Sequence, residues 1–192
     1  MRSAPRLPVW WRSVVSLSTS VRGIGDDFPI DLRSLTSRND IEVREGEMAA
    51  LGITLDADTI KVRSSLPADL KRLTTAHEIG HILVKRSRCP WLSSADEERF
   101  CDAFARELLA PVSAVGTMPA SDVEGAAARF GITQESILLQ LAALGIVEPL
   151  VSAGSGRILC IACGDRRRLL NCACALARGG STGELPHYPL SA

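Results

Sequence analysis

The segment TTAHEIGHILV, residues 74–84, constrains the fold and chemistry of this chain more than any other stretch. It places His77 and His81 four residues apart with Glu78 between them, in a sequence that has 3 histidines in all. On a helix, side chains four residues apart project from one face, one turn from each other. Two imidazole nitrogens could then reach the same metal ion, and Glu78 would lie about 100° round the helix from His77, at the edge of the same cleft.

The pattern H-E-x-x-H is typical of zinc hydrolases, in which the glutamate accepts a proton from the metal-bound water. The alternative interpretation is a buried helix with two hydrogen-bonded core histidines and a glutamate that faces solvent. That alternative requires separate hydrogen-bond partners for each buried ring, because unpaired polar groups are costly to bury. The motif therefore favours one zinc ion per chain, held by His77 and His81, with Glu78 as the catalytic base.

A catalytic zinc site also needs a third protein ligand and an open position. The third histidine, His187, lies in a loop-like tail. The acidic residues of the next predicted helix, which begins at Ser94, are better placed. They are Asp96, Glu97, Glu98 and Asp102.

Position along that helix separates these acids. Asp96 falls in the first turn, where the helix dipole already favours a carboxylate, and Glu97 would form a capping box with Ser94. Glu98 follows the histidine motif after enough chain for a loop and a returning antiparallel helix. We therefore favour Glu98 as the third metal ligand and Asp102, one turn further on the same face, as a carboxylate that orients a ligand.

Alternating apolar and polar residues predict short strands before the motif, and longer-period patterns predict helices around it. The predicted strands are 41–45, 52–55 and 59–64, and the predicted helices are 31–40, 64–86, 94–110 and a pair within 121–146. We expect an α+β fold with a small mixed or antiparallel sheet packed on a bundle of helices that contains the site. A helix-turn-helix-like pair and a short β-rich C-terminal region would follow.

Length and composition divide the chain of 192 residues into three parts. Residues 1–30 are expected to form a weakly ordered or amphipathic lead-in, 31–150 the domain with the metal site and the helix pair, and 151–192 a small β or loop extension. The 22 basic and 22 acidic residues balance, so the charge does not indicate a nucleic-acid or membrane surface. No apolar run could span a bilayer and no signal-peptide pattern is convincing, so we expect a cytoplasmic protein.

The histidine segment and the helix after it resemble the ImmA/IrrE-type zinc metallopeptidases of bacteria. In that family an A-H-E-x-G-H helix precedes a helix of the form E-x-x-C/A-N/D-x-F-A-x-E-L-L-x-P. The sequence EERFCDAFARELLAP supplies the second pattern in register, at Glu98, Cys101, Asp102, Phe104, Ala105, Glu107, Leu108, Leu109 and Pro111. The resemblance covers residues 31–146 and implies a zincin-like metallopeptidase domain in which Glu98 is the third zinc ligand.

This resemblance implies a zinc-dependent endopeptidase. Zinc-bound water would attack a peptide carbonyl while Glu78 takes the proton of that water and passes it to the leaving amine. Family members act on, or relieve repression by, helix-turn-helix repressors, so a repressor is the expected protein substrate. An extended peptide would lie along a sheet edge, for which the segment TIKVRSS (59–65) is our candidate.

Two other functions are open from the sequence. One is a non-proteolytic anti-repressor that binds its partner without cutting it. The other is a helix-turn-helix DNA-binding regulator built on the pair within 121–146. Charge disfavours the DNA-binding regulator, because residues 122–148 contain four acidic residues and one arginine, and phosphate contacts dominate DNA affinity. We therefore expect neither direct DNA binding nor a membrane partner.

The C-terminal cysteines allow a second metal site. Four of the 6 cysteines crowd this region, namely Cys160, Cys163, Cys172 and Cys174. Four thiolates could bind a zinc ion, but cysteines spaced two apart on an alternating strand are equally consistent with a buried core. The region between them predicts two strands around Gly164 and Asp165. The sequence does not identify an oxyanion-stabilising residue, for which His187 and Tyr188, adjacent to each other in the tail, are candidates.

Overall fold

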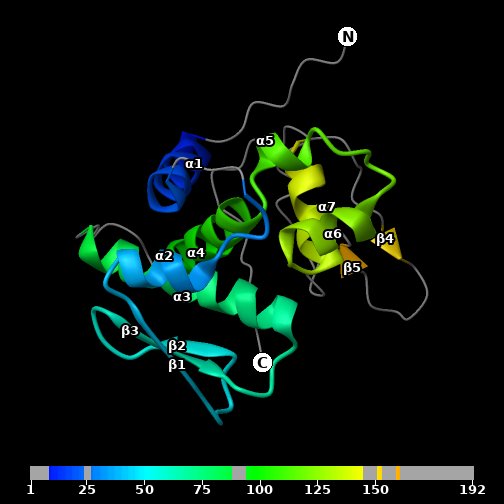
Figure 1. Cartoon of the computed structure of the whole chain (residues 1–192). Helices are drawn as coiled ribbons and strands as arrows, with labels where there is room; N and C mark the ends of the chain where they lie inside the picture. The colour runs from blue at the N-terminus through cyan, green and yellow to red at the C-terminus, as the bar shows by residue number, and fades with distance from the viewer. Residues whose placement is uncertain (1–8, 24–26, 88–93, 145–150, 153–158, 161–192) are drawn as a thin grey trace.

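The computed structural model describes residues 9–23, 27–87, 94–144, 151–152 and 159–160 (Figure 1). The helices in these ranges are α1 (Val9–Arg22), α2 (Leu32–Arg38), α3 (Ala68–Arg86), α4 (Ser94–Leu109), α5 (Val112–Val115), α6 (Val123–Phe130) and α7 (Gln134–Ala143). The strands are β1 (Glu42–Gly46), β2 (Gly52–Thr54), β3 (Thr59–Arg63), β4 (Val151–Ser152) and β5 (Leu159–Cys160). The expected α+β class is confirmed, and no described helix has the length and apolar character needed to cross a membrane.

Strands β1, β2 and β3 form a mixed sheet in the order β1-β3-β2. Strand β3 runs parallel to β1 and antiparallel to β2. The tight turn between β2 and β3 is held by the side chain of Asp56, which accepts hydrogen bonds from the backbone N–H groups of Asp58 and Thr59. Our candidate edge strand, TIKVRSS, is wrong, because β3 is the central strand and β2 forms the edge next to α3.

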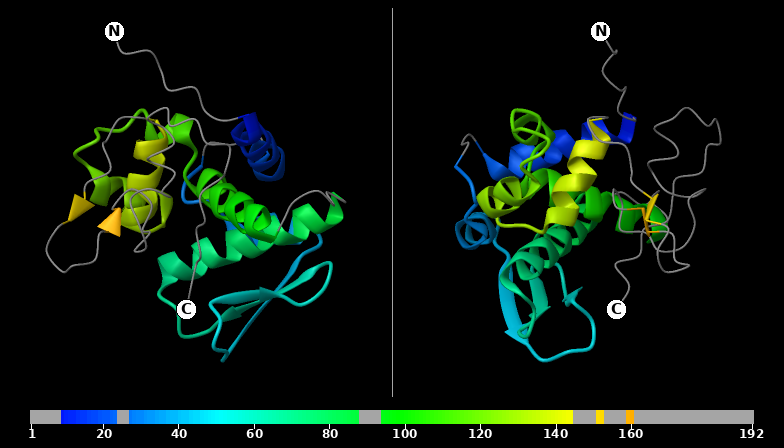
Figure 2. Two further views of the ribbon diagram at one scale, coloured as in Figure 1. Left: turned by 180° about the vertical axis from the view of Figure 1, so that it is seen from behind. Right: turned by 90° about the vertical axis from the view of Figure 1, so that its right-hand side faces the viewer.

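The elements stack in layers, with α3 between the sheet and α4, and with α1 on the far side of α4 (Figures 1 and 2). Alternation along β3 directs Ile60 and Val62 inward, and both are fully buried. Helix α3 is in contact with the sheet on one side and with α4 on the other, which explains why the motif segment is buried on most faces. Helix α3, which carries the histidine motif, is therefore held by the sheet on one side and by α4 on the other.

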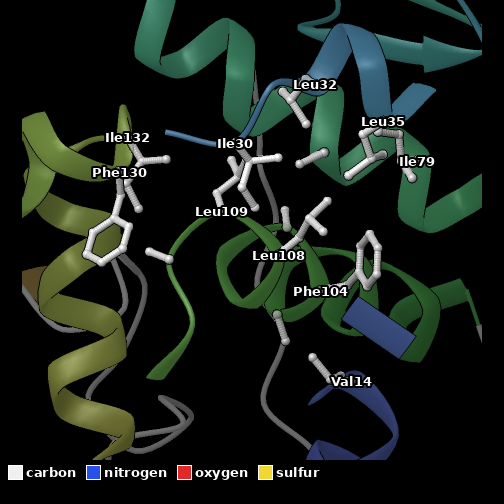
Figure 3. Close-up of a cluster of buried hydrophobic side chains, with 14 of the residues drawn as sticks. Val14, Ile30, Leu32, Leu35, Ile79, Phe104, Leu108, Leu109, Phe130 and Ile132 are labelled. Carbon is white, nitrogen blue, oxygen red and sulfur yellow. The ribbon is translucent and has the colours of Figure 1, made fainter. Parts of the chain in front are cut away.

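One hydrophobic core joins the helices (Figure 3). Ile79 of α3 lies with Phe104 and Leu108 of α4, and all three are fully buried. Val14 of α1 is also fully buried in this core, and Trp11 is 6% exposed. Residues 9–22 are thus an amphipathic helix packed on α4, and the core extends N-terminal to residue 31 rather than starting there.

Residues at the ends of α6 and α7 cap these helices. Thr133 caps α7 by accepting a hydrogen bond from the N–H of Ser136, and Gly131 ends α6 with a left-handed φ of 64°. Asp122 caps α6 by accepting a hydrogen bond from the N–H of Gly125, and α3 begins after Pro67 without a side-chain cap. The one-turn helix α5 was not predicted.

The pair α6 and α7 is fastened to α4 by a buried polar contact. Gln140 of α7 is fully buried, and its Nε2 donates to Oε2 of Glu107 at 3.1 Å and to the carbonyl of Ala110 at 2.7 Å. Glu107 also accepts from the N–H of Val112 at 3.1 Å, and burial raises the pKa of this carboxyl. These bonds join the pair α6 and α7 to the C-terminal end of α4.

Gly80 sets the distance between α3 and α4. A Cβ at this position would lie 3.1 Å from Sγ and 3.2 Å from Cα of Cys101. Alanine in place of a helical glycine normally adds stability of about 0.5–1 kcal/mol. We expect Gly80→Ala instead to lower the free energy of unfolding by about 1–3 kcal/mol, because the added methyl overpacks the helix contact. Urea unfolding measures this, and a variant as stable as wild type would contradict the contact.

Candidate metal centre

His77 and His81 of α3 and Glu98 of α4 meet at one point between the two helices. The Nε2 atoms of the two histidines are 3.1 Å apart. The two carboxylate oxygens of Glu98 each lie 3.3 Å from one of these nitrogens, Oε2 from His77 and Oε1 from His81. One ligand atom from each of the three residues can be chosen so that all lie within 4.8 Å of one another, which is a group able to hold a metal ion.

The donor set fits the chemistry of zinc. Two imidazole nitrogens and one carboxylate are the three-ligand combination of many catalytic zinc sites, which keep a fourth position for water. His77 is buried, whereas the Glu98 side chain is 49% exposed, so one side of the group faces outward. Hydrogen bonds from the two rings hold the pKa of the Glu98 carboxyl well below its usual range, so this side chain is ionised.

Each histidine also contacts a carboxylate through its other nitrogen. Oδ1 of Asp102 lies 2.9 Å from Nδ1 of His77, and Oε1 of Glu97 lies 2.7 Å from Nδ1 of His81. We call Asp102 and Glu97 the orienting carboxylates. Burial lowers the pKa of His77, but Asp102 and Glu98 outweigh burial and raise it to about 9. The Glu97 contact is a hydrogen bond, whereas Asp102 lies within ion-pair distance of Nδ1 of His77 without hydrogen-bond geometry. Carboxylate partners of this kind orient the ring of a metal-binding histidine.

Glu97 contacts His81, which differs from its predicted role. We expected Glu97 to be the capping partner of Ser94, whereas its carboxylate reaches across to His81. The signal that could have revealed it is chemical, because a metal-binding histidine generally donates its second N–H to an acceptor. Two metal-binding histidines need two such acceptors, and the sequence predicts only one, Asp102.

Glu78 lies in the same cleft as the two histidines. The side chains of α3 form one wall of this cleft, which measures about 360 Å³, and residues 50–54 form the opposite wall. Glu78 is 7% exposed, and its Oε2 accepts a hydrogen bond of 2.9 Å from Oγ1 of Thr54. The glutamate is therefore held inside the cleft, unlike the solvent-facing residue of the alternative interpretation.

The remaining candidates either lie outside the described residues or are described only in their backbone. Cys160 belongs to β5, where only the backbone is described. The other members of the second-site hypothesis and of the tail lie outside the described residues, namely Cys163, Cys172, Cys174, His187 and Tyr188. The predicted strands around Gly164 and Asp165 lie outside them as well.

No family model matches this chain, and no curated protein matches it. Among solved structures, it is similar to a Mycobacterium tuberculosis transcriptional regulator, with a TM-score of 0.52 and 17% sequence identity. The match covers 69% of this chain and 46% of the regulator, so the chain spans less than half of that protein. At this level of identity, the similarity shows a related fold.

The orienting carboxylates give a prediction about zinc affinity. We expect Asp102→Asn and Glu97→Gln each to weaken zinc affinity by about 10- to 100-fold, because each removes the negative charge behind one histidine and leaves the ligands in place. Competition with a chromophoric chelator measures the affinity. Glu135→Gln is the matched control, since Glu135 is an exposed acid in the first turn of α7. Unchanged affinity for both site variants would contradict the orienting role.

Proposed function

We propose that this chain is a zinc-dependent endopeptidase. The observation that supports this most directly is the meeting of three potential ligands beside a buried glutamate in one open cleft. His77, His81 and Glu98 would hold the ion. Zinc in such a site lowers the pKa of a bound water toward neutrality and polarises the peptide carbonyl.

The side chains have separate roles in this proposal. Glu78 accepts a proton from the attacking water and delivers it to the leaving amine. Asp102 and Glu97 hold the two imidazoles so that their Nε2 atoms face the ion. The half-exposed face of the group admits the peptide, which fits the zincin-like arrangement implied by the family resemblance.

Strand β2 is the edge on which the peptide would bind. Its neighbours in sequence, Leu51 and Leu55, make backbone hydrogen bonds of 2.9 Å to β3. Antiparallel pairing alternates along a strand, so Gly52 and Thr54 direct their backbone N–H and C=O groups away from β3. Both residues line the cleft, so an extended peptide can add to β2 as a further strand.

The proposed substrate is a helix-turn-helix transcriptional repressor in the cytoplasm. The family resemblance supports this choice, and the structurally similar protein is itself named a transcriptional regulator. A non-proteolytic anti-repressor is the second candidate, and the buried Glu78 beside the ligands favours the peptidase over it. Direct DNA binding is disfavoured further because Gln140 of the would-be recognition helix is fully buried against α4.

The test combines metal content with cleavage. Elemental analysis of the purified protein is expected to give about one zinc per chain. A helix-turn-helix repressor that is the substrate should be cut by this preparation, spared after chelation, and cut again when zinc is restored. A folded protein without bound metal would refute the proposal, and a content near two would indicate a second site at the C-terminal cysteines.

A further inference from the structure

The Glu78 carboxylate lies between two residues of strand β2. Oγ1 of Thr54 donates to Oε2 of Glu78 at 2.9 Å. A Cβ on Gly52 would lie 2.8 Å from Oε1 of Glu78 and 2.6 Å from Cγ2 of Thr74, so a larger side chain there would displace one or both of them. The strand therefore approaches the glutamate closely at one residue and hydrogen-bonds it at the next residue on the same face.

This contact matters because Glu78 is 7% exposed. A buried carboxylate is stable only when hydrogen-bond donors replace the water that it has lost. Within the described ranges, the Thr54 hydroxyl is the donor that Glu78 has. With Oε2 engaged in this way, Oε1 is the oxygen left to accept a proton.

From this arrangement we infer that Thr54 is the positioning residue of Glu78 and couples the peptide-binding edge to the base. This inference rests on the proposed endopeptidase function. Thr54 lines the cleft, and its backbone groups, which point away from β3, would pair with an extended peptide, while its side chain fixes the carboxylate that acts on the same peptide. Thr54 would then both bind the substrate along β2 and hold the Glu78 carboxylate in place.

Three variants test the role of Thr54. Thr54→Val keeps the β-branched shape without the hydroxyl, whereas Thr54→Ser keeps the hydroxyl. We expect Thr54→Val to lower kcat for the repressor by about 10- to 100-fold, with KM and zinc content unchanged, because a misplaced base is slow even when the substrate binds. Thr54→Ser should restore most of the rate. Thr36→Val is the matched control, since Thr36 is buried and donates only within its own helix.

Certain kinetic results would overturn the inference. It fails if Thr54→Val retains the wild-type kcat, if its loss falls on KM alone, or if Thr54→Ser is as slow as Thr54→Val. It also fails if the Thr36→Val control loses as much kcat, since the effect would then reflect general packing.

A thermal double-mutant cycle separates this inference from the proposed function, because it needs no substrate. Thr54→Val should lower the Tm of the otherwise wild-type protein and lower it by less in a Glu78→Ala background, where the hydroxyl has no carboxylate to bind. Equal shifts in the two backgrounds would overturn the contact itself.

If wild type cleaves nothing, the endopeptidase proposal fails, and the coupling role fails with it. If wild type cleaves and Thr54→Val matches its kcat, only the inference fails.

Discussion

The variant Glu78→Gln is expected to keep its zinc and to lose cleavage of the repressor. Glutamine preserves the size of the side chain and can still accept a hydrogen bond from Thr54, but it cannot take a proton from water. General acid–base catalysis by one group contributes about 10²- to 10⁴-fold, so kcat should fall by this factor. Co-expression with the repressor, followed by quantification of intact and cut protein, measures the loss.

The matched control is Glu124→Gln, which makes the same exchange at an exposed acid in the first turn of α6. It should cleave as wild type does. Cutting by Glu78→Gln at the wild-type rate would show that Glu78 is not the base, and loss of zinc from that variant would show that it supports the ligands instead.

Removal of the third ligand should have the largest effect on the metal. Glu98→Ala leaves two imidazoles, and we expect zinc affinity to fall by more than about 100-fold, beyond the loss from either orienting carboxylate. Cleavage should be abolished at ordinary zinc concentrations. Calorimetric titration of the metal-free protein gives the affinity, and the same preparation gives the activity.

Asp96→Ala is the neighbouring control for this experiment. Asp96 lies two residues earlier on α4, where its carboxylate pairs with Arg99 at 2.9 Å instead of facing the two histidines. This variant should bind zinc as wild type does. Full zinc affinity in Glu98→Ala, or its loss in Asp96→Ala, would contradict the assignment of Glu98.

The elements of the fold could be predicted where their signal is local. The spacing of His77, Glu78 and His81 specifies one face of one helix, and the short strands before it alternate clearly, so both were found from sequence. Strand order is not local. The parallel pairing of β1 with β3 encloses β3 in the sheet and leaves β2 at the edge, and no pattern within a strand encodes this.

The same distinction applies to the site. Glu98 was favoured from its position after the motif, and the structure brings it to the two histidines. Glu97 was misassigned because a capping box is a local rule, whereas its contact with His81 depends on how α4 packs across α3. Thr54 could not be found at all, since 24 residues separate it from Glu78 and only the fold brings them together.

The position of the three ligands on two separate helices has a thermodynamic consequence. An ion held by α3 and α4 together binds the folded chain and not the unfolded one, so metal and fold are linked. Above the dissociation constant, each tenfold rise in free zinc would add about 1.4 kcal/mol to the free energy of unfolding. The amount of intact protein in a cell would then follow its zinc supply. Scarcity of the metal would reduce the proposed peptidase activity by shortening the lifetime of the folded protein as well as by slowing its turnover of substrate.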